Sequence, residues 1–246
     1  MSQKIRRERI LELILQHSFV TVQYLSSVLQ YSTATINRDL NAMQSEGLVK
    51  RSYGGVEAVK RSHLPPLPQR QYYHKKEKRK LAEAAVELIE NGDTIFLAAG
   101  TTIQYMIPYL REKKDLCIIT NSLHIAIELG MSELQVICLG GQISEHPYVL
   151  NGSDTVENAM RYRPDKMFFS NAGVTKQGDI CGNNLLYRVM IKNSTQVWYL
   201  ADHTKLIEHG KEVLCDFSAL TGIISDFDFP EWTREQYKNT AFVTVK

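Results

Sequence analysis

Residues 32–43, Ser-Thr-Ala-Thr-Ile-Asn-Arg-Asp-Leu-Asn-Ala-Met, contain the hydrogen-bonding side chains that proteins use to contact nucleic acids. Ile36, Leu40 and Met43 recur at helical spacing, which predicts a helix with one buried face. Ser32 stands at the N-cap position, where its hydroxyl can accept an N–H of the first turn. The other face offers hydroxyl, amide and guanidinium groups on Thr33, Thr35, Asn37, Arg38 and Asn41. Such groups contact base edges and phosphates, so we predict a DNA-recognition helix here.

A second set of residues has the chemistry to bind a phosphate. Small polar residues follow apolar runs that resemble buried strands, and ligands bind at this edge of a parallel sheet. Backbone N–H groups at the following helix N-termini can hold an anion. The candidates are Gly100, Thr101, Thr102, Thr120, Asn121, Ser122, Gly140, Gly141 and Gly173. Lys205 could add a positive charge, and Asp202 could accept a hydrogen bond from a sugar hydroxyl.

Each of these positions also has an ordinary structural explanation. A single Gly-Thr or Gly-Gly at a strand end is more often plain turn chemistry. Thr101 and Ser122 could cap helices, and Asp202 with Lys205 could form a solvent-exposed pair. The phosphate interpretation depends on five such loops meeting at one sheet edge, rather than on any single motif.

Further elements must position the recognition helix. Residues 4–16 and 22–29 have the spacing of amphipathic helices, and Thr21 stands at the N-cap of the second. Two strand-like runs around Gly54-Gly55 predict a hairpin that holds Lys50, Arg51 and Tyr53, with Lys50 and Arg51 facing the phosphate backbone. A helix-turn-helix followed by such a hairpin is a winged helix.

The charge distribution agrees with a polyanionic partner. Residues 1–80 carry 15 Lys and Arg against 6 Asp and Glu, a net charge of +9, whereas residues 81–246 carry −7. A basic first part and an acidic second part suggest that the first part contacts nucleic acid. Because several of these charges cluster at residues 75–80, a solvated basic linker remains an alternative for that cluster.

The second part of the chain has the pattern of an α/β fold. Three prolines within residues 65–68 predict a semi-rigid linker over residues 60–74. Beyond it, apolar strand-like runs alternate with helices, which predicts a mostly parallel sheet covered on both faces. The predicted strands are 94–97, 116–119, 135–139, 166–169 and 196–200, with weaker candidates at 222–225 and 241–245. We therefore predict three parts: a winged helix-turn-helix domain (1–59), the linker (60–74) and an α/β domain (75–246).

Several classes of protein are disfavoured. The sequence has no apolar run of about 20 residues and no secretory signal, so we expect a cytoplasmic protein without a membrane span. Its four cysteines have no metal-ligand spacing, which predicts reduced, buried thiols and no metal or cofactor.

The first part resembles the DeoR family of bacterial transcriptional regulators. The resemblance rests on Thr35-Ile36-Asn37-Arg38-Asp39-Leu40 followed by Arg51-Ser52-Tyr53-Gly54-Gly55. Asn37 stands where that family most often has a second arginine, and Tyr53 where it usually has histidine. The resemblance implies a DNA-binding regulator, with repression the commoner outcome.

The order of elements in the second part is similar to the sensor domain of the same family, which has the fold of ribose-5-phosphate isomerase. Gly100-Thr101-Thr102 match its phosphate loop, Thr120-Asn121 its Thr-Asn strand end, Gly140-Gly141 its Gly-Gly, and Asp202 with Lys205 its Asp-x-x-Lys. The resemblance implies an effector that is a phosphorylated sugar or a related metabolite, and regulation of sugar or nucleoside catabolic genes.

Three positions depart from the family pattern, and they leave alternatives open. Ala98, Asn183 and Tyr187 stand where the family often has charged residues. The second domain could therefore be an oligomerisation module with a vestigial pocket. A sugar-phosphate isomerase with a DNA-binding appendage is disfavoured, because proton transfer needs a base that these positions lack.

A single winged helix makes an interface of roughly 600–1,000 Å², which is small for specific DNA binding. We therefore expect a homodimer or homotetramer that binds repeated half-sites of a double-stranded operator, with the α/β domain joining the copies.

Overall fold

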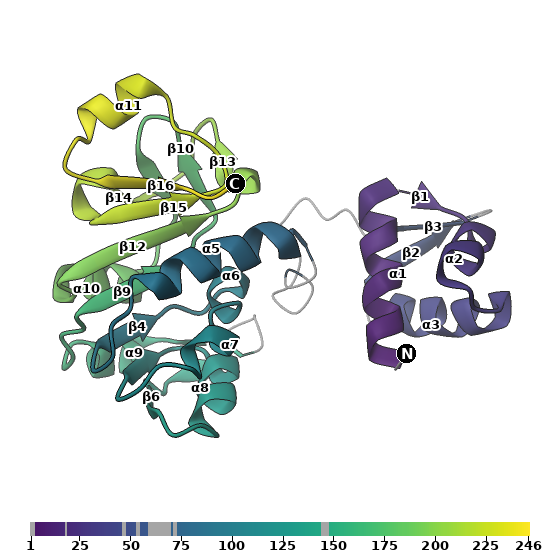
Figure 1. The fold of residues 1–246 in the computed structure, drawn as a ribbon, viewed down its shortest axis with the longest axis horizontal. Helices are drawn as coiled ribbons and strands as arrows, with labels where there is room; N and C mark the ends of the chain where they lie inside the picture. The colour runs from purple at the N-terminus through teal and green to yellow at the C-terminus, as the bar shows by residue number, and fades with distance from the viewer. Residues whose placement is uncertain are drawn as a thin grey trace. The chain divides into compact units, whose positions relative to one another are not determined.

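The structure is a computed structural model of the chain. It describes residues 3–17, 19–45, 48–52, 55–58, 70, 73–143 and 148–246. They belong to two compact units, Met1–Tyr73 and His74–Lys246 (Figure 1). Tyr53, and the predicted linker residues other than Arg70, Tyr73 and His74, lie outside the described residues.

The first unit is three helices against a small antiparallel sheet. Thr21 caps α2, because its Oγ1 accepts the backbone N–H of Tyr24 at 3.1 Å. Ser32 caps α3 in the same way, through the N–H of Thr35 at 3.2 Å. The predicted helices and hairpin are confirmed, and β1 is too short for a sequence pattern to reveal. The elements are α1 (Gln3–His17), β1 (Phe19–Val20), α2 (Val22–Leu29), α3 (Thr33–Ser45), β2 (Val49–Ser52) and β3 (Gly55–Ala58), with sheet order β1-β3-β2.

A buried carboxylate joins α1 to α3. Asp39 is fully buried, and its two oxygens lie 2.5 Å from Arg6 Nε and 3.4 Å from Arg7 Nε. Gln3 Nε2 donates to it at 3.4 Å, and the Arg6 guanidinium also covers the ring of Tyr31. Burial alone would raise the pKa of Asp39, but the hydrogen bonds from Arg6 and Gln3 and the Arg6 charge lower it. Asp39 is therefore a structural ion-pair partner rather than part of the exposed face of α3.

The second unit is built on a parallel sheet of seven strands in the order β16-β15-β12-β9-β4-β5-β6. All seven predicted strands are present to within a residue at each end. The strands are β4 (Thr94–Leu97), β5 (Cys117–Thr120), β6 (Gln135–Cys138), β9 (Lys166–Phe169), β12 (Gln196–Ala201), β15 (Gly222–Ser225) and β16 (Ala241–Thr244).

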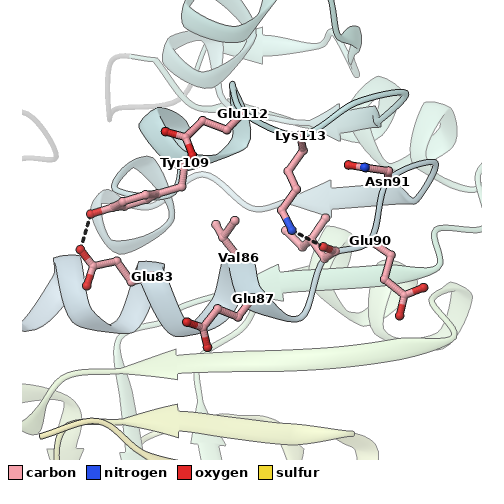
Figure 2. Close-up of a pocket in the computed structure, with 9 residues that line it drawn as sticks. Glu83, Val86, Glu87, Glu90, Asn91, Tyr109, Glu112 and Lys113 are labelled. Atoms are coloured by element: carbon pink, nitrogen blue, oxygen red, sulfur yellow. Dashed lines mark hydrogen bonds between the residues drawn. The ribbon is translucent and has the colours of Figure 1, made fainter.

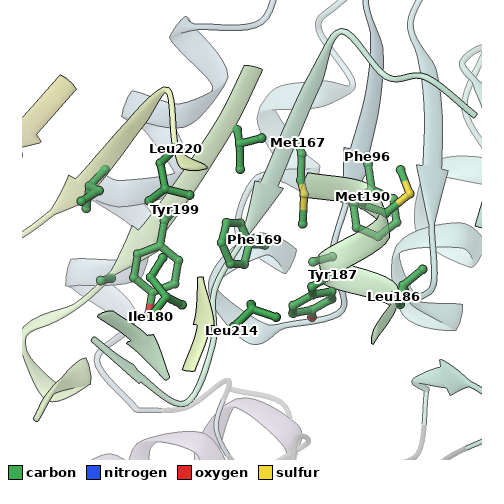
Figure 3. Packing of buried hydrophobic residues seen from close by; sticks show 14 of the residues in the cluster. Phe96, Met167, Phe169, Ile180, Leu186, Tyr187, Met190, Tyr199, Leu214 and Leu220 are labelled. Carbon is green, nitrogen blue, oxygen red and sulfur yellow. The ribbon is translucent and has the colours of Figure 1, made fainter. Parts of the chain in front are cut away.

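Helices cover both faces of this sheet, because successive strand residues point to opposite sides. Ile95 and Leu97 pack against α5–α8, whereas Phe96 packs against α9 and α10. On the second face Phe169 lies between Tyr187 and Tyr199, with ring centroids 5.7 and 5.1 Å away (Figure 3). The helices are α5 (Lys75–Glu87), α6 (Thr101–Gln104), α7 (Ile107–Leu110), α8 (Leu123–Gly130), α9 (Ser153–Ala159), α10 (Leu185–Asn193) and α11 (Glu231–Gln236).

A second, four-stranded sheet was not predicted. Gly173, predicted to be in a ligand loop, begins β10, where an added Cβ would lie 2.4 Å from Ile207 Cδ1. A larger residue at this position would therefore require the Ile207 side chain on β13 to shift. The elements are β10 (Gly173–Thr175), β11 (Asp179–Cys181), β13 (Leu206–Ile207) and β14 (Val213–Asp216), with the short helices η1 (His203–Lys205) and η2 (Phe217–Ala219) and the hairpin β7 (Gln142–Ile143)–β8 (Leu150–Asn151).

The cysteines differ in exposure. Cys138 is exposed because β6 is an edge strand, so the prediction that the cysteines are buried is wrong there. Cys181 is buried, and burial raises the pKa of the half-buried Cys215 thiol to about 12. Across the described residues, no helix is long and apolar enough to cross a membrane.

Candidate DNA-binding surface and effector site

The apolar face of α3 is confirmed, since Ile36, Leu40 and Met43 are fully buried. The opposite face exposes Thr33, Arg38 and Asn41, with Thr35 and Asn37 half-buried. Arg38 makes no hydrogen bond or ion pair with another residue in the part of the chain that the structure describes. Its guanidinium is therefore available to an external acceptor.

The hairpin contributes two cations in different environments. Lys50 is exposed and lies 3.8 Å from Glu57 on the neighbouring strand, a separation typical of a weak surface pair. Arg51 instead donates from Nη1 to Asn41 Oδ1 at 2.7 Å and from Nη2 to Asn37 Oδ1 at 2.5 Å. The two neighbours in sequence therefore have different surroundings, which the sequence alone did not indicate.

In the second unit, the sheet order brings the predicted loops together. β12, β9, β4, β5 and β6 are consecutive parallel neighbours, so their carboxyl ends meet along one edge of the sheet. Gly173 begins β10, which pairs with β13 directly after Lys205.

Hydrogen bonds within this edge fix the loop that precedes α6. Asn121 is buried; its Oδ1 accepts from Ala99 N at 2.9 Å and its Nδ2 donates to Leu150 O at 3.1 Å. Thr120 Oγ1 donates to Leu97 O at 2.7 Å and accepts from Ser122 N at 3.0 Å. These side chains shape the loop rather than offer free polar atoms.

The Gly-Thr-Thr segment opens α6. Gly100 is the N-cap in an extended conformation, and Thr101 and Thr102 are both buried. The first N–H groups of a helix have no intrahelical partner and favour an anion. Ser122 similarly caps α8, accepting the N–H of Ile125 at 3.3 Å.

A side chain on α9 holds the Gly140-Gly141 pair in place. Both glycines have left-handed backbones, with φ +72° at Gly140 and +107° at Gly141. Thr155 Oγ1 donates to Gly140 O at 2.7 Å, and a Cβ on Gly141 would lie 2.0 Å from that hydroxyl. Beside them a cavity of about 340 Å³ lies between the first turns of α9 and α10. Its lining is neutral and combines polar with apolar residues: Asn151, Gly152, Ser153, Thr155, Val156, Asn183, Asn184, Leu185 and Leu186.

Asp202 and Lys205 lie on η1. Asp202 is buried, and its Oδ1 accepts from the backbone N–H of Thr204 at 3.0 Å and from the Thr204 hydroxyl, so it caps η1. His203 contacts Asp226 at 2.8 Å and the ring of His74 at a centroid distance of 5.0 Å. The hydrogen bond with Asp226 raises the pKa of His203 and outweighs the opposing effect of burial.

A larger hollow of about 660 Å³ lies at the opposite edge of the sheet, between α5 and α7 (Figure 2). Its lining includes Lys113, whose Nζ donates to a backbone carbonyl, and Tyr109, whose hydroxyl donates to Glu83 at 2.5 Å. Its acidic residues are Glu83, Glu87, Glu90 and Glu112. Four carboxylates repel a phosphate, so this hollow is a poor candidate for the effector site.

Comparisons with known proteins agree with this geometry. Residues 73–227 match the DeoR C terminal sensor domain, and residues 6–62 match the DeoR-like helix-turn-helix domain. The chain belongs to the DeoR family. It is thus a DNA-binding transcriptional regulator.

Relatives within the DeoR family align over most of the chain. The uncharacterized HTH-type transcriptional regulator FruR of Bacillus subtilis is 30% identical, over 98% of this chain and 97% of that protein. The HTH-type transcriptional repressor GlcR of B. subtilis is 31% identical, over 84% and 81%. The glycerol-3-phosphate regulon repressor of Escherichia coli is 27% identical, over 92% of each.

Among solved structures, a D-ribose-5-phosphate isomerase in complex with phospho-erythronic acid is 16% identical, with a TM-score of 0.41. The match covers 55% of this chain and 55% of that one. A likeness this distant says nothing about activity.

Positions that depart from the DeoR-family pattern have structural partners here. Ala98 is buried, and the Tyr187 hydroxyl donates to Ala99 O at 3.4 Å. Asn183 Nδ2 donates to Glu212 Oε1 at 2.8 Å and also lines the smaller cavity. The sequence analysis missed Asn151 and Asn184 at that cavity, because Asn151 ends β8, a strand of only two residues, and Asn184 follows no strand directly.

Proposed function

We propose that this DeoR-family regulator is a cytoplasmic repressor of sugar or nucleoside catabolic genes, and that a phosphorylated sugar bound by its sensor domain sets its affinity for DNA. The observation that supports this most is the meeting of five adjacent strand ends at one sheet edge, with Gly100-Thr101-Thr102 at the start of α6. The name of one relative, the glycerol-3-phosphate regulon repressor, points to control linked to a phosphorylated metabolite.

In this proposal the phosphate binds the backbone N–H groups at Gly100–Thr102, and Asp202 and Lys205 bind the sugar. Thr120, Asn121, Ser122, Gly140 and Gly141 hold these loops in place. The effector can change DNA affinity only if it binds the DNA-competent and incompetent states differently. The site binds rather than catalyses, since neutral residues occupy positions 98 and 183; turnover of any sugar phosphate would contradict this.

Thermal unfolding with a panel of sugar phosphates tests the effector proposal. The matching compound is expected to stabilise the sensor domain saturably, by about 2.7 kcal/mol at a hundredfold excess over its Kd. Thr101→Val, which removes one hydroxyl beside the proposed phosphate, is expected to weaken that response. Thr195→Val, at an exposed position directly before β12 and so at the opposite edge of the sheet, is the control and should leave the response unchanged. A panel without any saturable shift would favour the vestigial-pocket alternative.

The proposed DNA-binding residues divide into two groups. Arg38 is the proposed base contact, so Arg38→Ala should cost about 1–3 kcal/mol of operator affinity, concentrated at one base pair of each half-site. Lys50 is a proposed phosphate contact, so Lys50→Ala should weaken binding to all DNA sequences alike. It should also reduce the salt slope, the dependence of log affinity on log salt concentration, by about 1. Titration of both variants at fixed salt tests this assignment. Unchanged affinity for Arg38→Ala would refute the role of α3.

We also propose residues 1–59 as the DNA-binding part and residues 75–246 as the part that binds effector and joins the copies. Exposed apolar side chains on this second part, among them Ile127, Met131 and Ile143, are available for contact with another copy. Sedimentation of the full chain should give a dimer or tetramer, and a monomer at the concentrations that bind DNA would contradict this.

A further inference from the structure

Arg51 forms a bridge between the wing and the recognition helix. Asn37 and Asn41 stand four residues apart on α3 and therefore lie on the same face, one turn from each other. The guanidinium of Arg51 on β2 donates one hydrogen bond to each, at 2.5 and 2.7 Å. One side chain thus holds both amides of the exposed face.

This bridge fixes the orientation of each side-chain amide, that is, which side its oxygen and its nitrogen face. An asparagine amide has one acceptor oxygen and one NH₂ donor, whereas arginine has donors only. Each amide must therefore turn its oxygen toward Arg51. Within the described residues, the two Nδ2 groups have no hydrogen-bond partner, so they remain available as donors on the DNA-facing side.

We propose that Arg51 is a positioning residue for sequence recognition: it orients Asn37 and Asn41 so that α3 presents amide donors to the bases. Such donors match the acceptors of the major groove, namely purine N7, guanine O6 and thymine O4. They do not match cytosine, which offers only its amino group there. The proposal rests on the proposed entry of α3 into the major groove.

The proposal changes the role predicted for Arg51, which was contact with the phosphate backbone. Both terminal nitrogens already bind α3, and the fork geometry of a guanidinium allows this double contact. Lysine has a single ammonium on a flexible stem and cannot reproduce the fork. Lys50, the adjacent residue, is exposed and pairs with Glu57 on β3, and among the described residues it forms no hydrogen bond or ion pair with α3, so it is the control.

The test is selection from a randomised double-stranded DNA library, followed by titration of single-base variants of the selected site. Arg51→Met and Arg51→Lys are expected to lose roughly threefold to tenfold in discrimination against cytosine at one or two positions of each half-site, the range of one neutral hydrogen bond. Their salt slope should stay at the wild-type value. Lys50→Met should keep the preference and lower the slope by about 1.

A uniform loss of affinity with a lower salt slope in Arg51→Met would overturn the proposal and restore the phosphate contact. An unchanged base preference in that variant would overturn it too. If Arg51→Met unfolds the wing, Asn37→Ala and Asn41→Ala test the same point, since each should remove one of the two preferences. Wild-type protein that selects no sequence would instead refute the proposed function itself.

Discussion

Asp39→Asn is expected to destabilise the DNA-binding unit by about 3–5 kcal/mol, the cost of removing one partner from a buried ion pair. The carboxylate is fully buried, and the variant would leave the guanidinium groups of Arg6 and Arg7 without their counter-charge. A small domain has only about 5–15 kcal/mol in total, so the loss is a large fraction of the stability of this unit. Chemical denaturation of the full chain should show the transition of this unit at a lower denaturant concentration.

The same pair gives the unit a dependence on pH. The pKa of Asp39 is lowered in the folded protein. The stability that Asp39 contributes is therefore fully present above the pKa of the unfolded chain, about 3.9, and is lost as the pH falls through the folded pKa. Asp39→Asn should abolish this acid-sensitive part of the stability of the unit. Glu12→Gln is the control, since half-buried Glu12 pairs with the exposed Arg9 at 3.6 Å and its loss should cost less than about 1 kcal/mol. Equal effects of the two variants would show that Asp39 is not a structural anchor.

Gly141→Ala should destabilise the sensor domain by about 2–5 kcal/mol. A left-handed backbone costs a residue with a Cβ about 1–2 kcal/mol, and overpacking adds about 1–3 kcal/mol. The new Cβ would lie 2.0 Å from Thr155 Oγ1 and 2.8 Å from Asn151 O, which no rotamer change relieves completely. The displaced α9 should also weaken the response to the effector.

Gly92→Ala separates these two costs. Gly92 has a similar φ of +89°, but no atom lies within 4 Å of the position of its Cβ. It should therefore show the backbone cost alone, about 1–2 kcal/mol, with an unchanged effector response. Thermal unfolding of both variants, with and without effector, makes the comparison. Equal destabilisation would mean that α9 moves aside without cost.

The large sheet could be predicted because its strands are buried on both faces. In the run 166–169, Lys-Met-Phe-Phe, the last three residues are apolar because side chains on each side pack against a covering layer, and the following polar residues mark its end. The helices of the first unit were equally predictable, since their apolar spacing and caps are local features.

The second sheet could not be predicted in this way. β10, β11 and β13 have two or three residues each, which is too short for any periodic pattern, and β13 and β14 pair with strands that lie far from them in the chain. β10, which begins at Gly173, was therefore not recognised as a strand. The burial of Asp39 and the bridge from Arg51 to Asn37 are also contacts between distant residues, so the local sequence gave no sign of them.

The sequence predicted the positions of the candidate effector residues at the sheet edge more accurately than it predicted what their polar atoms bind. Five strand ends do meet, but Thr120, Asn121 and Asp202 use their polar atoms within the protein. Small polar residues at strand ends serve both loop geometry and ligand binding, and their types alone do not distinguish the two.

The unequal exposure of the four thiols gives this protein a ready attachment point for a reporter dye. Cys138 is exposed, whereas burial raises the pKa of Cys117, Cys181 and Cys215 and keeps them protonated and slow to react. A maleimide fluorophore therefore labels Cys138 first. This residue ends β6, two positions before Gly140, so the unmodified sequence already places the dye beside the proposed effector loop, where effector binding is expected to change its emission.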